Sequence, residues 1–173
     1  MTGLYVLTKY LTFPGCLMRG FWQQVVCRLC KVPVEDNRYI RNDETCGHIE
    51  HEFIPRARGA FAFCFVPAFM MSIMAFMLCL IPAFITIYLE IGDIYLKIAS
   101  AVSYWFAISF YVNSYPMIED AMNMMNKVYK HGNILQKIFY APSAVILYLG
   151  AYLERYGITF ILAVAATVLL VTV

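Results

Sequence analysis

Apolar residues run along most of this chain in blocks, and short polar stretches separate the blocks. A helix needs roughly 20 apolar residues to cross a bilayer. The blocks therefore predict about five transmembrane helices, at residues 1–29, 59–89, 98–115, 134–153 and 157–173. The last two are separated only by a three-residue polar turn, so we expect a tight helical hairpin, or four spans if the two form one long bent element. The pattern is typical of an all-α polytopic membrane protein with a single membrane domain, 1–173.

The first apolar block is interrupted at two places. Pro14 and Gly15 lie in its middle and predict a kink or break, because proline removes a backbone hydrogen bond. Arg19 follows four residues later. A charged side chain inside a membrane is costly unless it faces the protein interior and a polar partner. We therefore treat Arg19 as a candidate site residue.

Residues 30–58 are too polar to span a membrane. Two extended segments, 34–41 and 47–53, flank the turn-forming residues 42–45, which predicts a short β-hairpin insertion after the first span. Later in the chain, residues 117–130 alternate methionine and valine with asparagine and lysine, as an interfacial amphipathic helix does.

Composition and charge agree with a membrane protein. The 173 residues are 62% hydrophobic and 14% charged, whereas about a quarter of the residues in soluble domains are charged. The net charge of +2 is too small to suggest nucleic acid as a partner. Lys and Arg concentrate in the loops, six within residues 28–58 and three within 117–137. The positive-inside rule therefore predicts that the insertion 30–58 and the loop 117–133 are cytoplasmic.

A motif in the first block resembles a known family. The matching residues are Pro14, Gly15, Cys27, Arg28, Leu29, Val32 and Val34. Together they are similar to the pattern P-G-x-x-x-H-E-x-x-H-x-x-x-C-R-L-x-G-V-x-V of site-2-type intramembrane metalloproteases, in particular a small prokaryotic branch. Where that family has His-Glu-x-x-His, which binds zinc and activates water, this chain has Arg19-Gly20-Phe21-Trp22-Gln23. The resemblance implies the fold and a prokaryotic inner-membrane location, but not the reaction.

A second landmark of the family is a proline followed by the acidic third zinc ligand. Pro116, Asp120 and Ala121 match it. The resemblance implies that Asp120 faces the helix that carries Arg19 and Gln23, so Arg19 is expected to pair with Asp120; Glu119 and Asn113 are the next candidates. The alternative is that Asp120 caps the helix that follows the proline.

In the resembling proteases, the hairpin pairs with an extended substrate by strand addition. The resemblance therefore implies a partner-binding edge formed by Gly47, His48, Ile49, Glu50 and His51.

Four residues have metal-binding side chains but lack the usual paired spacing: Cys27, Cys30, Cys46 and His48. We interpret these side chains as solvated residues of the hairpin rather than as a metal site. We expect neither a metal nor another cofactor, and the six cysteines mostly lie in apolar runs, as buried thiols rather than disulfides do.

The sequence thus favours a catalytically inactive site-2-protease-like protein that lies in the lipid bilayer and binds a membrane protein or peptide. One alternative is a metal-dependent membrane peptidase with unorthodox ligands such as His48, His51 and Asp120. Another is a small subunit of a membrane transporter or other membrane complex, because broken helices and buried charge also mark permeation paths.

Overall fold

The computed structural model describes residues 3–36, 39, 46–52, 54–88 and 94–172. Helices dominate this part of the chain. The elements in order are α1 (Gly3–Leu11), α2 (Phe13–Cys30), β1 (Val34–Asp36), β2 (Glu50–His51), α3 (Ala57–Tyr88), α4 (Ile94–Val112), α5 (Ile118–Asn126), the π-helical turn η1 (Lys127–His131), α6 (Ile134–Arg155) and α7 (Ile158–Thr172).

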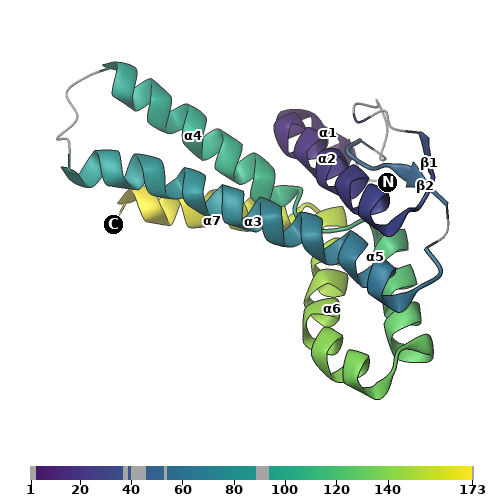
Figure 1. Cartoon of the computed structure of the whole chain (residues 1–173). Helices are drawn as coiled ribbons and strands as arrows, with labels where there is room; N and C mark the ends of the chain where they lie inside the picture. The colour runs from purple at the N-terminus through teal and green to yellow at the C-terminus, as the bar shows by residue number, and fades with distance from the viewer. Residues whose placement is uncertain (1–2, 37–38, 40–45, 53, 89–93, 173) are drawn as a thin grey trace.

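The helices form two limbs that meet near the N-terminus (Figure 1). One limb holds α3, α4 and α7; the other holds α5, η1 and α6. Helix α2 and the two strands lie where the limbs meet, and α2 packs on both α3 and α4. This junction brings residues from the N-terminal, middle and C-terminal parts of the chain together.

The predicted break in the first block is confirmed, and it falls at Thr12, two residues before the proline. Pro14 occupies the first turn of α2, where its missing N–H group costs no helical hydrogen bond. Gly15 allows α2 to approach α4 closely, since a Cβ there would lie 2.0 Å from the Ser109 carbonyl oxygen. The Gly15 N–H instead donates to the Ser109 hydroxyl at 2.7 Å.

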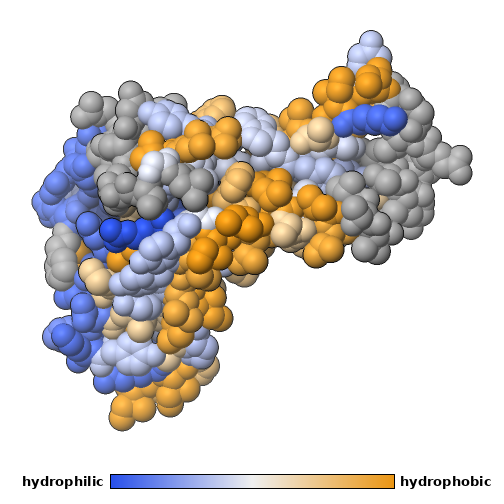
Figure 2. Space-filling model, turned by 180° about the vertical axis from the view of Figure 1, so that it is seen from behind, coloured by the Kyte–Doolittle hydropathy of each residue, from blue (hydrophilic) through white to orange (hydrophobic). Residues whose placement is uncertain are grey.

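Two helices are long and apolar enough to cross a membrane, Ala57–Phe84 and Ile134–Arg155, and Ile158–Leu169 is a shorter apolar helix. Many large apolar side chains on these helices are exposed, among them Phe69, Phe76, Phe84, Ile138, Phe139, Ile146, Ile161 and Leu169. Figure 2 shows apolar surface on both limbs. Surfaces of this kind mark contact with lipid or protein. The helical architecture is confirmed and membrane association is supported, while the count of five spans stays a prediction.

The β-hairpin is present but shorter than predicted. Strands β1 and β2 pair antiparallel, with Val34 opposite His51 and Asp36 opposite Glu50. The predicted turn at 42–45 lies outside the described residues. The helix predicted over 117–130 is also found, as α5 and η1, and it turns Ala121, Met124 and Val128 into the core.

The predicted hairpin of the last two helices is wrong. Helix α7 leaves the end of α6 and runs beside α3 and α4 (Figure 1). It packs on α4 as well as on α6. An apolar helix gains more by covering an existing apolar face than by following its sequence neighbour, and α4 supplies that face.

Candidate functional site

Three charged side chains are buried together where the two limbs meet. Lys9 of α1, Arg19 of α2 and Glu154 of α6 are 2%, 1% and 4% exposed. Glu154 Oε1 accepts hydrogen bonds from Arg19 Nη1 at 3.1 Å and from Lys9 Nζ. Two cations therefore share one carboxylate, and this buried triad carries a net charge of +1.

Arg19 also binds main-chain oxygens. Its Nε and Nη2 donate to the carbonyls of Gly47 and Cys46 at 3.1 and 3.0 Å, and its Nη1 donates to the carbonyl of Tyr115 at 3.3 Å. Gln23, one helical turn further along α2, accepts the Ile49 N–H at 3.2 Å. The side chains at the two positions where the family pattern has histidine thus hold the main chain of residues 46–49 against α2.

Two of the five residues of the expected partner-binding edge are already engaged within the chain. Gly47 and Ile49 are buried, and α2 already uses the Gly47 carbonyl and the Ile49 N–H. His48 and His51 are half-buried and Glu50 is exposed. Only the outward side of this segment is accessible to a partner.

Asn113 is fully buried at the end of α4 and joins the triad to the break between α1 and α2. Its Oδ1 accepts from Lys9 Nζ at 2.7 Å. Its Nδ2 donates to the Thr12 carbonyl and hydroxyl at 3.1 and 2.8 Å, and to the Ser109 carbonyl at 2.9 Å. Charged and polar groups at the junction are thereby fixed in one hydrogen-bonded network.

Asp120 is not the partner of Arg19, contrary to our expectation, because the end of α6 brings Glu154 to Arg19 instead. Asp120 is not the helix cap either, since Met117 precedes α5. Its carboxylate faces two histidines: Oδ2 lies 3.4 Å from His48 Nδ1 and Oδ1 lies 3.7 Å from His51 Nε2. Pro116 is buried and lies two residues before the first residue of α5.

The three residues that a metal-dependent peptidase would use, His48, His51 and Asp120, do lie close together. Among the described residues, however, no group of three or more His, Cys, Asp and Glu side chains is arranged to hold a metal ion. Cys27 is buried in α2 and Cys30 is exposed at its end; all six cysteines are free. Cys46 Sγ lies 3.8 Å from the Tyr39 carbonyl.

The two histidines have pKa values shifted in opposite directions. Burial lowers the pKa of His48, aided by the charges of Arg19 and His51 and opposed by Asp120. Burial also acts to lower the pKa of His51, but its hydrogen bonds to Asp120 and to the Glu52 carbonyl, with nearby negative charge, raise that pKa above the ordinary value.

We expect these shifts to make stability depend on pH in two opposite ways. The stability that His48 contributes to the folded state is fully present above its unfolded pKa of about 6.5. It is lost as pH falls through the lowered pKa of the folded state, because the buried imidazole must then take up a proton. The stability that His51 contributes to the folded state is fully present below about pH 6.5. It is lost as pH rises through the raised pKa of the folded state, because the imidazolium then loses its proton. Thermal unfolding in detergent between about pH 5 and pH 8 should therefore show greatest stability near the middle of that range.

Matched variants distinguish the loss of stability at low pH from the loss at high pH. His48→Gln should remove the loss at low pH and His51→Gln the loss at high pH. The exposed His131, replaced in the same way, serves as the control. A profile that keeps its shape in both variants would contradict the assignment.

Sequence reasoning missed Lys9 and Glu154. Lys9 lies inside the first apolar block, and Glu154 was assigned to the loop after the fourth span. A search for every charge inside or bordering an apolar block would have found both. It would not have paired them, because 145 positions separate them in the chain.

Comparison of the chain with protein-family models, with curated proteins and with solved structures finds no match.

Proposed function

We propose that this chain is a catalytically inactive, site-2-protease-like membrane protein that binds another membrane protein or peptide. The observation that supports this most is the use of Arg19 and Gln23. Both side chains are buried and bind main-chain groups of residues 46–49. Arginine is always cationic and has no lone pair for a metal, so a zinc site at these positions would lose one ligand outright.

The same hydrogen bonds support the binding of a polypeptide beside α2. Recognition of a polypeptide through its main-chain groups gives affinity with little demand on sequence. The chain's own segment 46–49 is held in this way, which fixes the short sheet beside α2. We infer that the partner contacts the outward side of this segment, at His48 and Glu50, with the insertion 30–58 on the cytoplasmic side of an inner membrane.

The proposal predicts that the purified protein, reconstituted in vesicles, does not cleave membrane-embedded peptides, with or without added zinc. The physical reason is that neither a metal-bound water nor a glutamate base is available between Arg19 and Gln23. The assay measures product by mass spectrometry, and Asp120→Ala serves as the matched variant. Cleavage that disappears in Asp120→Ala would show that the chain is a peptidase.

A photo-crosslinking amino acid tests partner binding in cells. Placed at the exposed Glu50, it should give a discrete adduct with one protein. Placed at Ile134, which is 76% exposed at the far end of α6, it should give no such adduct. Equal adduct patterns at both positions would contradict a partner site on the segment 46–51.

A further inference from the structure

The limb that holds α5, η1 and α6 ends in a turn, residues 127–139, where the chain passes from η1 into α6 (Figure 1). We propose that the turn 127–139 binds the head groups of anionic phospholipids at a bilayer surface, with the start of α6 inserted among their acyl chains. The proposal rests on membrane association, which the two long apolar helices support, and not on the proposed protein partner.

Large apolar side chains are exposed at the start of α6. Ile134, Leu135, Ile138 and Phe139 are 76%, 69%, 64% and 74% exposed. The same side of the helix continues further along the chain with three more exposed residues, Val145, Ile146 and Leu149. A continuous apolar face of this kind is unfavourable in water, so it marks contact with lipid or with protein.

Hydrogen bonds fix the turn to the rest of the limb. The Gly132 N–H donates to the Val128 carbonyl at 3.2 Å where η1 ends, and Val128 is fully buried in the core. The Asn133 N–H donates to Gln136 Oε1 at 3.2 Å where α6 begins. The exposed apolar residues therefore follow directly on a segment that is anchored in the core, and the fold itself places them at the end of the limb.

The charge of this region is positive. Every charged side chain within residues 121–153 is a lysine: Lys127, Lys130 and Lys137. Lys130 is exposed and Lys137 is half-buried, and neither forms an ion pair with any residue that the structure describes. Figure 2 shows hydrophilic surface beside apolar surface at the end of this limb. Positive charge and exposed apolar carbon thus lie together at the turn.

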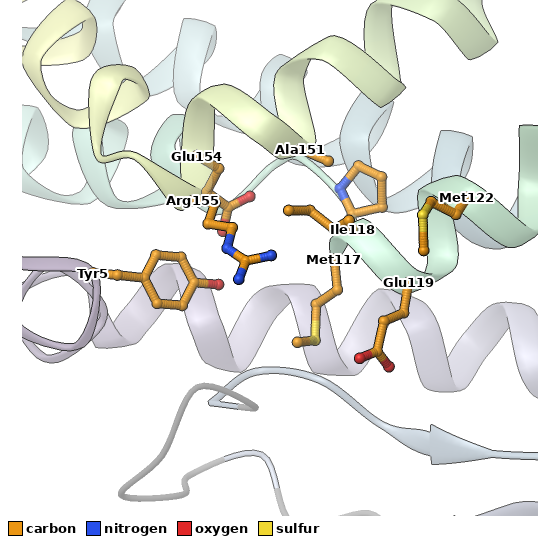
Figure 3. A pocket seen from close by; sticks show the side chains of 9 residues that line it. Tyr5, Met117, Ile118, Glu119, Met122, Ala151, Glu154 and Arg155 are labelled. Carbon is orange, nitrogen blue, oxygen red and sulfur yellow. The ribbon is translucent and has the colours of Figure 1, made fainter. Parts of the chain in front are cut away.

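The carboxylates of the limb lie at its other end. Glu154 and Arg155 at the end of α6 line a pocket together with Glu119 of α5, so both signs of charge meet there (Figure 3). The 22 residues of α6 extend about 33 Å, roughly four Debye lengths at physiological salt. Carboxylates at the junction therefore do not neutralise the lysines of the turn.

The combination of basic and apolar groups favours a lipid surface as the partner. Lysines at a membrane interface bind anionic head groups, while neighbouring large apolar side chains enter the acyl region. A soluble anion or a nucleic acid would contact the lysines and leave Ile134, Leu135 and Phe139 in water. A helix long enough to cross a bilayer begins at Ile134, which puts the turn at the level of the head groups.

Native mass spectrometry of the detergent-purified full chain tests the proposal, with phosphatidylglycerol titrated against phosphatidylcholine of the same acyl chains. Each lysine at an anionic surface contributes about a fivefold preference, so we expect phosphatidylglycerol to bind roughly 20-fold more tightly. Lys130→Gln combined with Lys137→Gln should remove this preference. The control is Arg56→Gln combined with Arg58→Gln, at two exposed arginines beside α3, and it should keep the preference.

A conservative variant separates the effect of charge from a change in folding. Lys130→Arg combined with Lys137→Arg keeps both charges and should keep the preference for phosphatidylglycerol. A photo-crosslinking amino acid at Leu135 should attach to lipid. Equal binding of the two lipids, equal losses in the two glutamine variants, or a discrete protein adduct at Leu135 would each overturn the proposal. Absence of the Glu50 adduct would contradict only the proposed function.

Discussion

Replacing Glu154 with glutamine is expected to cause the largest loss of stability of any single charge removal in this chain. The substitution keeps the shape of the side chain but leaves Lys9 and Arg19 buried without a counter-charge. Breaking one buried pair by removing a partner costs roughly 3–5 kcal/mol, and here two cations lose the same carboxylate. Thermal unfolding in detergent should show the effect, with the exposed Glu119→Gln as the control.

A second substitution tests whether the loss of stability comes from the unpaired cations. Adding Lys9→Met to Glu154→Gln removes one of the two stranded cations, so the double variant should be more stable than Glu154→Gln alone. A double-mutant cycle measures this coupling directly. If the two losses simply add, or if Glu154→Gln unfolds like Glu119→Gln, the triad does not stabilise the junction.

Gly47→Ala is expected to have the second largest effect. Gly47 has φ +75°, and a Cβ there would lie 2.6 Å from both Cys16 Cα and the Cys16 carbonyl oxygen. The left-handed backbone costs about 1–2 kcal/mol for a residue with a Cβ. The clash adds about 1–3 kcal/mol as overpacking, because the contacted atoms belong to the backbone of α2 and cannot rotate away.

Two measurements distinguish this effect from general destabilisation. Gly3→Ala is the control, since nothing lies within 4 Å of a Cβ at Gly3. Hydrogen exchange of the Ile49 amide, which Gln23 protects at 3.2 Å, should speed up in Gly47→Ala and not in Gly3→Ala. Unchanged protection at Ile49 would show that residues 46–49 do not depend on close contact with α2.

A buried polar network in the structure bears on the alternative of a transporter subunit. Lys9, Arg19, Glu154 and Asn113 form a buried polar network, as permeation paths often contain. Each of these side chains is bonded to another within the network, and Asn113 is also bonded to Thr12 and Ser109. We interpret the network as a fixed structural junction.

Local patterns in the sequence predicted much of the fold. The apolar blocks, Pro14 and the polar insertion indicated the helices, the break and the hairpin, because each depends on neighbours within a few residues. The burial of Arg19 was also predictable, since a charge in an apolar block must find a partner inside the protein.

The partner itself was decided by tertiary structure. The sequence predicted Asp120 as the partner of Arg19. In the structure, the path of α6 brings Glu154 to Arg19, and Asp120 lies beside His48 and His51 instead. The path of α7 was not predictable either, because an apolar helix can pack on any apolar face of sufficient size. Sequence alone determined which segments are helical and that Arg19 must be buried. Only the packing of the two limbs decided which buried charges meet, since contacts between α1, α2 and α6 join residues more than 100 positions apart.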